Sequence, residues 1–256
     1  MKAMILAAGR GERMRPLTDT IPKPLLPVGG RPLVAHLIGR LIREGYADIV
    51  VNHAYLGAHI EKALGDGRKF GARIRYSREQ VGALDTGGGI RNALPLLGED
   101  PFLVVNGDIW TDYPFSRLMN EPRHLAHLVL VTNPSHNRKG DFGLIPSPIT
   151  KLPAGRGGIG DCPVSYEKVS DGRVSNQEGE RLTFSGLGVY RPELFSDWEG
   201  NFPLGQVLRH AADRDEVTGE RHAGDWQDIG TPEQLRNLVE RFQGNAAEKI
   251  SDPLLS

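Results

Sequence analysis

Cysteine is almost absent from this sequence, because Cys162 is the single example among 256 residues. No disulfide can form within the chain, which is typical of proteins from a reducing compartment, and we expect a cytoplasmic location. Cys162 has no metal-binding or redox motif beside it and is interpreted as an ordinary loop residue. Long apolar runs are also missing. None approaches the roughly 18 residues of a membrane-spanning helix, and residues 4–8 are too short for a signal-peptide core, so we expect no membrane partner.

The chain also lacks an excess of charge of either sign. It has 31 basic and 32 acidic residues, for a formal net charge of −1. Nucleic acids and anionic membranes attract proteins through clustered positive charge, so the composition gives no reason to expect a nucleic-acid partner. With 39% hydrophobic residues, a chain of this length can bury one sizeable core, as a globular enzyme or binding domain would.

Short apolar runs alternate with helical patterns through the first half of the sequence. We expect strands at residues 2–7, 49–52, 73–76, 102–106 and 127–132, and helices at residues 33–45, 58–64 and 87–97. This alternation favours an α/β fold with a Rossmann-like, doubly wound, mixed but mostly parallel sheet flanked by helices. Ligands of such folds gather at the carboxyl ends of the strands.

The pattern weakens after Gly140. Residues 146–163 are rich in Pro, Gly and Ser and predict an exposed loop. We expect a strand at 182–190, a helix at 204–213 and a short strand at 226–229. Thr231 should then cap a last helix, with Pro232 in its first turn and Gln234 completing a capping box. We expect that helix to end near Phe242 and residues 243–256 to form a mobile tail.

A glycine- and arginine-rich segment follows the first predicted strand. Its small residues Ala8, Gly9 and Gly11 let backbone N–H groups approach a polyanion closely. Arg13 adds a fork of donors suited to phosphate, and Lys23 adds a point charge between two prolines. Neither the dinucleotide fingerprint, which needs a third glycine, nor the P-loop, which needs Gly-Lys-Ser/Thr, fits here. Taken alone, the segment could also be a structural tight turn.

The longer stretch resembles the signature of the sugar-phosphate nucleotidyltransferases. It runs as Leu6-Ala-Ala-Gly-x-Gly-x-Arg-Met-x-Pro-Leu-Thr18, followed by Pro22-Lys-Pro-Leu-Leu-Pro-Val-x-Gly-x-Pro-Leu33. The resemblance implies a GT-A-like fold that binds UTP or another nucleoside triphosphate together with a sugar 1-phosphate. It also implies catalytic roles for Arg13, Lys23 and Asp108. The nucleotide contacts it implies are Ala8, Gly9, Gly11, Glu12, Arg13, Lys23, Thr86, Gly87 and Asn106.

Two aspartates lie where a metal ligand is useful. Asp108 follows the predicted strand that ends at Asn106, and Asp228 directly precedes the capped last helix. Each could also be a plain turn residue. In the resembled family, aspartates at these two places jointly hold the metal, so the resemblance implies Mg²⁺ bound by Asp108 and Asp228. The family cradles the nucleobase at the counterpart of residues 84–89, which could otherwise be only a helix entry; Asn52 and His53 could line the same site.

These parts permit a direct displacement. A sugar 1-phosphate has a second pKa of about 6 and is already an anion at neutral pH, so no general base is needed. The difficulty is to bring it onto the α-phosphorus of another anion. Catalysis should therefore come from charge neutralisation and in-line positioning by Arg13, Lys23, Mg²⁺ and loop amides. We expect no covalent enzyme intermediate, since no Ser-His-Asp nucleophile motif is recognisable.

The sugar is indicated by segments outside the nucleotide loop. The Glu-Lys-Pro motif of the wider family is missing, because Glu167-Lys168 is followed by Val169. The chain resembles instead the N-acetylmuramate 1-phosphate uridylyltransferases of bacterial cell-wall (peptidoglycan) recycling. This resemblance is carried by residues 51–54, 84–90, 105–112, 140–142 and 183–186.

The resemblance implies sugar contacts from Asp141, which could also be a turn acid, and from Gly186. It implies one domain over residues 1–242, with a nucleotide-binding half at 1–132 and a sugar-phosphate-binding half at 133–242 that carries an insertion at 145–166. A mannose 1-phosphate guanylyltransferase or a glucose 1-phosphate thymidylyltransferase is the alternative. A non-catalytic nucleotide sensor is a remote one.

Overall fold

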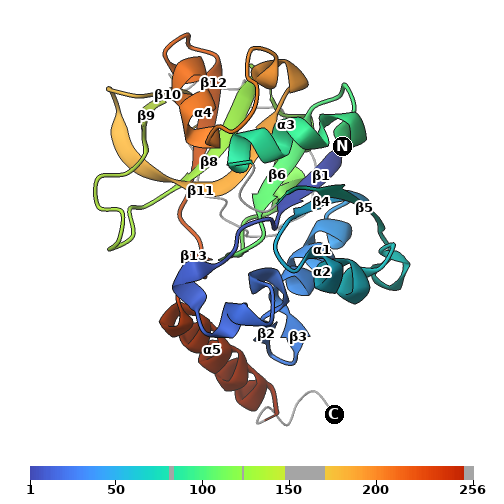
Figure 1. The fold of residues 1–256 in the computed structure, drawn as a ribbon. Helices are drawn as coiled ribbons and strands as arrows, with labels where there is room; N and C mark the ends of the chain where they lie inside the picture. Colours follow the sequence, from blue (N-terminus) through green and yellow to red (C-terminus); the bar gives the residue numbers. More distant parts are fainter. Residues whose placement is uncertain (81–83, 123, 148–170, 251–256) are drawn as a thin grey trace, which may run out of the picture.

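The structure, a computed structural model, describes residues 1–80, 84–122, 124–147 and 171–250. Cys162, the Glu167–Val169 segment and most of the predicted insertion therefore lie outside the described residues. A nine-stranded sheet with the order β5-β4-β1-β6-β11-β8-β12-β10-β9 forms the centre of the molecule (Figure 1). Among the described helices, none has the length and apolar character needed to cross a bilayer.

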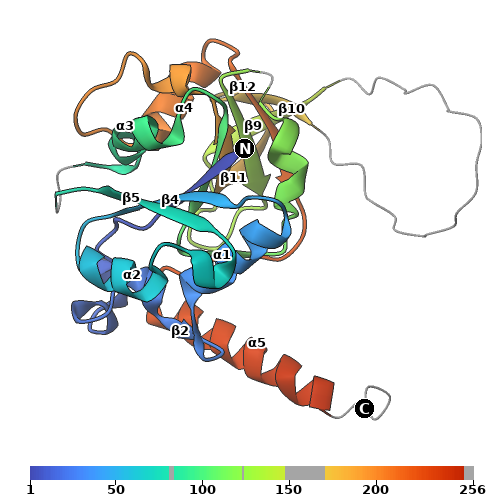
Figure 2. The same cartoon turned by 90° about the vertical axis from the view of Figure 1, so that its right-hand side faces the viewer.

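The first four strands of this order form a parallel unit, as the alternating sequence pattern predicted. They are β1 (Lys2–Leu6), β4 (Asp48–His53), β5 (Arg73–Arg78) and β6 (Phe102–Asn106). Figure 2 shows α3 (Thr86–Leu97) on one face of this unit and α1 (Leu33–Arg43) and α2 (Gly57–Leu64) on the other. Each face buries its own apolar cluster, so the strands are apolar on both sides. All of their carboxyl ends lie along one edge.

The sheet is mixed, as predicted, but antiparallel pairing predominates in its second half, so the sheet is less parallel than expected. β11 (Glu180–Tyr190) runs antiparallel to β6 and to β8 (Ala126–Val131), whereas β12 (Val217–His222) runs parallel to β8. β9 (Phe142–Pro146) and β10 (Gly172–Ser175) complete the order by antiparallel pairing. β9 also pairs with β11, which closes five strands into a barrel. β10 and β11 both run antiparallel to β9, one on each side of it, so residues 176–179 carry the chain from one side of β9 to the other.

The last helix is longer than the sequence pattern indicated. α4 (Leu204–Ala212) agrees with its predicted range, but α5 extends from Pro232 to Ile250 instead of ending near Phe242. The predicted helix end was therefore wrong, whereas the mobility of residues 243–256 stays a prediction, and residues 251–256 lie outside the described part. The added turns are rich in Ala, Glu, Lys and Gln, which favour helix, and each adds a hydrogen bond to an existing helix.

A third, small apolar cluster docks α5 beneath the N-terminal loop. Met14, Val28, Leu33 and Leu238 are among its buried members, and Phe242 packs against it. Two short ladders frame this region: β2 (Pro27–Val28) with β3 (Arg31–Pro32), and β7 (Ile109–Thr111) with β13 (Trp226–Asp228). The second ladder ties the start of α5 to the segment after β6, which brings distant parts of the sequence to one place.

Candidate active site

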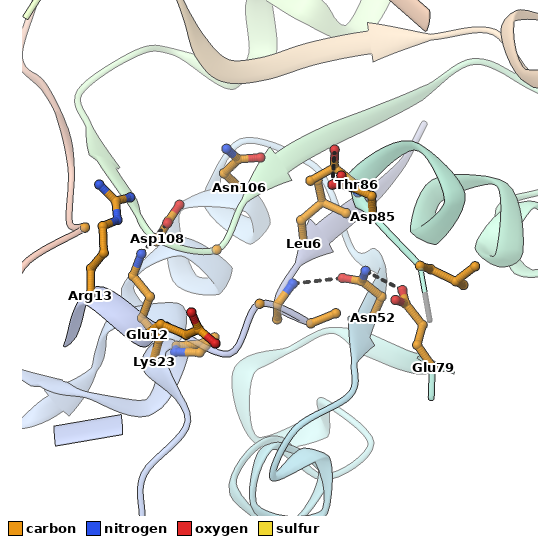
Figure 3. A pocket seen from close by; sticks show the side chains of 18 residues that line it. Leu6, Glu12, Arg13, Lys23, Asn52, Glu79, Asp85, Thr86, Asn106 and Asp108 are labelled. Carbon is orange, nitrogen blue, oxygen red and sulfur yellow. Dashed lines mark hydrogen bonds and ion pairs between the residues drawn. The ribbon is translucent and has the colours of Figure 1, made fainter. Parts of the chain in front are cut away.

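A pocket of about 470 Å³ opens at the carboxyl ends of β1, β4 and β6 (Figure 3). This is the edge at which ligands were expected. The predicted residues that line it are Ala8, Gly9, Gly11, Glu12, Arg13, Lys23, Thr86, Asn106 and Asp108. The pocket is also lined by residues that were not predicted to belong to it, namely Leu6, Ala7, Pro24, Glu79, Gly107 and Gly230. Leu84 and Asp85, from the segment expected to cradle the nucleobase, line it too, as does Asn52. His53, which we expected could line the site, does not appear in the lining.

The loop after β1 depends on Gly11. Its φ is +69°, a left-handed conformation that glycine adopts readily. A Cβ at this position would lie 3.0 Å from Thr18 Cγ2 and 3.3 Å from Lys23 Cβ. The Gly11 carbonyl accepts hydrogen bonds from the Thr18 hydroxyl, at 2.8 Å, and from the Met14 N–H, at 2.9 Å. The glycine thus folds the loop tightly enough to bring Arg13 and Lys23 to one pocket.

Two cations and one acid meet on the pocket wall. The Lys23 ammonium lies 2.5 Å from Oδ2 of Asp108, and the Lys23 side chain is only 11% exposed. Arg13, at the exposed end of a 3-10 turn (Glu12–Met14), lies beside Gly230, where a Cβ would be 3.0 Å from its Nη2. Figure 3 shows Arg13, Lys23 and Asp108 converging on the same side of the pocket. This side is suited to phosphate groups.

The two predicted metal ligands are neighbours in the β7–β13 ladder. Asp228 pairs with Ile109, and the Ile229 N–H donates to the Asp108 carbonyl at 2.8 Å. Asp228 itself does not line the pocket. Its Oδ1 accepts from Gln234 Nε2 at 3.2 Å, and its Oδ2 lies 3.6 Å from His136 Nε2. Within the described ranges, no group of three or more His, Cys, Asp or Glu side chains is arranged to hold a metal by itself.

The opposite side of the pocket carries a hydrogen-bonded relay. The Ala7 N–H donates to Asn52 Oδ1 at 2.8 Å, and Asn52 Nδ2 donates to Glu79 Oε1 at 2.7 Å (Figure 3). Burial raises the pKa of Glu79, while the bond from Asn52 opposes that shift. Glu79 belongs to no motif. Its position one residue beyond β5, at the same sheet edge as the glycine loop, is the sequence signal that could have identified it.

Thr86 and Gly87 have different surroundings. Thr86 lines the pocket, and its hydroxyl accepts from the Leu204 N–H at 2.9 Å. Gly87 does not line the pocket. Its N–H donates to the Phe202 carbonyl at 3.1 Å, and a Cβ there would meet the Phe202 ring. Gly87 therefore packs the start of α3 against residues 202–204, and its contact with a nucleotide stays a prediction.

The predicted sugar contacts, Asp141 and Gly186, belong to the barrel half of the fold and do not line the pocket. Gly186, with φ +79°, sits in a bulge where the pairing of β11 with β8 shifts between Phe184 and Leu187. A Cβ on Gly186 would lie 2.6 Å from Asn106 Nδ2, so this backbone closely approaches a pocket residue. Asp141 accepts from the Phe184 N–H at 2.9 Å and from Asn137 Nδ2 at 3.1 Å. These bonds brace its loop on β11, and sugar binding by Asp141 and Gly186 stays a prediction.

Residues 2–155 match the nucleotidyl transferase family. The chain belongs to this family. This nucleotidyl transferase is similar over almost its whole length to the N-acetylmuramate alpha-1-phosphate uridylyltransferase of Neisseria meningitidis serogroup B, with 49% identity over 92% of this chain and 96% of that protein. It is also similar to the mannose-1-phosphate guanylyltransferase of Mycobacterium tuberculosis, with 37% identity, but over 46% of this chain and 33% of that protein.

The fold of the nucleotidyl transferase also has solved counterparts. The crystal structure of a UDP-glucose pyrophosphorylase complexed with UDP-glucose superposes with a TM-score of 0.70 at 18% sequence identity, covering 95% of this chain and 98% of that one. At this identity the likeness concerns the fold alone.

Proposed function

We propose that the protein transfers the uridylyl group of UTP to N-acetylmuramate 1-phosphate, forming UDP-N-acetylmuramate and pyrophosphate in cytoplasmic peptidoglycan recycling. The observation that carries this proposal is the extent of the likeness to the Neisseria uridylyltransferase, which covers 92% of this chain and therefore reaches far beyond the N-terminal loop. The likeness to the Mycobacterium guanylyltransferase covers less than half of the chain. The division into a nucleotide half at residues 1–132 and a sugar half at 133–242 is part of the proposal.

The proposed reaction is one in-line displacement. A phosphate oxygen of the sugar 1-phosphate forms a bond to the α-phosphorus of UTP, and the bond from that phosphorus to the bridging oxygen of pyrophosphate breaks. No proton has to be removed from the nucleophile, which is already an anion. The enzyme must instead hold two anions together, and charge from Arg13 and Lys23 at the pocket wall supports that role.

The residues present also fit a magnesium ion. Mg²⁺ uses one or two carboxylates and completes its coordination with phosphate oxygens and water. Asp108 and Asp228 stand at adjoining ladder positions, and their side chains are 32% and 23% exposed. A metal held there would supply positive charge between the phosphates of the two substrates. The Gln234 amide keeps the Asp228 carboxylate oriented for it.

The relay opposite the cations suits the base of the nucleotide. Glu79 and Asn52 are polar, half-buried or buried, and aligned by the backbone of Ala7. An ionised Glu79 carboxylate can accept the N3–H of uracil, a hydrogen that cytosine lacks. Leu84 and Leu6 add apolar surface to the same pocket.

A substrate panel tests the proposal. Purified protein with Mg²⁺ is given UTP, GTP or dTTP, each with N-acetylmuramate, mannose or glucose 1-phosphate, and pyrophosphate release is measured. The proposal expects the highest kcat/KM for UTP with N-acetylmuramate 1-phosphate. Preferred turnover of mannose 1-phosphate with GTP, or of glucose 1-phosphate with dTTP, would overturn the assignment of substrates while leaving the reaction class intact. No turnover of any pair, with nucleotide still bound, would favour a nucleotide sensor.

A further inference from the structure

Arg10 stands in the glycine loop, yet its side chain does not line the pocket. Gly9 and Gly11 on either side do line it. The Arg10 guanidinium lies over the ring of Tyr55 instead, 4.3 Å from the ring centroid, a cation–π geometry. Tyr55 belongs to the connection between β4 and α2, so this contact joins the loop after β1 to the segment that follows β4.

Tyr55 also holds the far end of the same segment. Its hydroxyl donates to the Asp19 carbonyl at 2.8 Å. One aromatic side chain therefore contacts residues on both flanks of the stretch that contains Gly11 and Arg13. Inside that stretch, the Thr18 hydroxyl donates to the Gly11 carbonyl, which ties the two flanks to each other. The three contacts form a bracket around the proposed triphosphate-binding residues.

The turn that carries Tyr55 is itself closely constrained. Leu56 has φ +54°, a left-handed conformation that residues other than glycine rarely adopt. A Cβ on Gly57 would overlap the ring of His53, so glycine is required for the close approach of the helix start. His53 Nε2 lies 2.7 Å from Glu61 Oε1, and Glu61 in turn accepts two bonds from Arg78. Tyr55 thus projects from a rigid base.

We propose that Arg10 and Tyr55 are positioning residues that order the triphosphate loop before the nucleotide binds. The inference rests on the proposed function, because it takes the nucleoside triphosphate as the ligand of that loop. A flexible loop loses conformational entropy when it wraps a polyanion, and prior ordering reduces that loss. Arg10 does this from outside the pocket, whereas Arg13 faces the ligand.

A double-mutant cycle tests the inference. Arg10→Met and Tyr55→Leu are made singly and together, with UTP affinity measured by calorimetry and KM and kcat measured for both substrates. Each single variant should weaken UTP binding by about 2- to 10-fold, the range expected for a partly exposed cation–π contact and the loop order that depends on it. The double variant should be no weaker than the worse single variant. The KM for the sugar phosphate and the melting temperature should change little.

Conservative variants separate the two contacts of Tyr55. Tyr55→Phe keeps the ring under Arg10 but removes the bond to Asp19, so its effect on UTP affinity should be smaller than that of Tyr55→Leu. Arg10→Lys should restore part of the affinity lost in Arg10→Met. Lys69→Met is the matched control, because Lys69 lies over the ring of Phe70 at 4.9 Å, away from the pocket. It should leave UTP affinity unchanged.

Two results would overturn the inference. Independent, multiplying losses from the two single variants would mean that the residues do not act together. A large fall in kcat for Arg10→Met with an unaffected Tyr55→Leu would make Arg10 a direct phosphate ligand. Failure of the unaltered protein to bind UTP would count against the proposed function instead, so the two failures are distinguishable.

Discussion

The ammonium of Lys23 and the carboxylate of Asp108 form an ion pair on one wall of the pocket, with Nζ 2.5 Å from Oδ2. The pair joins the residue proposed to meet phosphate with a residue proposed to hold magnesium. Each side chain neutralises the other, so neither charge is left without a partner at the pocket wall. In the proposed reaction, a metal–nucleotide complex would offer each of them a new partner of opposite charge, phosphate for Lys23 and metal for Asp108.

Asp108→Asn should therefore lower turnover by about 100-fold or more, which is the scale for losing one element of electrostatic transition-state stabilisation. Thermal stability should change much less, because the side chain is 32% exposed. Steady-state kinetics and a melting curve measure the two effects. Asp112→Asn is the control, since Asp112 follows on the same segment but pairs with His222. Near-normal turnover in Asp108→Asn would remove Asp108 from the metal site.

Gln234→Met should raise the Mg²⁺ concentration needed for half-maximal activity by about 10-fold. The amide of Gln234 donates to Asp228 and accepts from the Gly230 N–H at 2.8 Å, and loss of such partners weakens metal sites by 10- to 100-fold. Direct Mn²⁺ binding, followed by electron paramagnetic resonance, should weaken in parallel. Glu233→Gln, on the same turn and exposed, is the comparison. An unchanged metal dependence would leave Gln234 only its role at the helix start.

Glu79→Gln should reduce the preference for UTP over CTP by about 5- to 100-fold, the worth of a good base-specific pair. In the unaltered protein, this preference should also fall as the solution becomes more acidic. Burial raises the pKa of Glu79, so its carboxylate takes up a proton at a higher pH than an exposed glutamate would. The ratio of kcat/KM for the two nucleotides between pH 8 and pH 5 measures both effects. A ratio that is the same in both proteins at every pH would exclude Glu79 from base recognition.

Tyr190→Phe should stabilise the protein by about 1 kcal/mol, a shift of roughly 2–4 °C in melting temperature for a chain of this size. The Tyr190 hydroxyl is fully buried and has no hydrogen-bond partner in the part of the chain that the structure describes. Tyr46→Phe is the matched comparison, because it removes a buried hydroxyl that does have a hydrogen-bond partner. The Tyr46 hydroxyl donates to the Phe115 carbonyl at 2.9 Å, and its removal should destabilise by about 1 kcal/mol. Equal effects of the two variants would contradict this reasoning.

His127 should make folding stability depend on pH in the mildly acidic range. Burial lowers the pKa of His127, although nearby Glu121 opposes the shift. As the pH falls through about 6.5, the unfolded chain takes up a proton at this histidine and the folded chain does not, so stability is lost. His127→Gln should flatten the slope of unfolding free energy between pH 7 and pH 5. A slope in His127→Gln equal to that of the unaltered protein would exclude His127 as its source.

The nucleotide side of the pocket was largely predictable because its signals are local in the sequence. Gly11, Arg13 and Lys23 fall within one short stretch, and the glycine conformation and the two cations require no distant partner to be recognised. The parallel unit was predictable for the same reason, since periods of apolar residues report strands and helices directly. The end of α5 was predicted too early because few apolar residues follow Phe242. The residues beyond Phe242 nevertheless favour helix, and α5 continues to Ile250.

Other features required the folded chain. Whether a barrel strand is parallel or antiparallel depends on the strand beside which it lies. The sequence of residues 142–146 does not indicate that its neighbours are residues 172–175 and 180–182. Glu79 accepts a hydrogen bond from Asn52 in the pocket, and Tyr55 contacts the N-terminal loop at Arg10 and Asp19. These contacts join residues that are far apart in the sequence.

The sequence by itself thus determined the reaction class and predicted Gly11, Arg13 and Lys23, which line the pocket. Only the tertiary structure decided that Asp228 pairs with the residue after Asp108, that Gly87 packs against Phe202, and that Arg10 lies over Tyr55 instead of lining the pocket. The physical reason is that local composition sets what a segment can bind, whereas packing between distant segments sets which way each side chain faces.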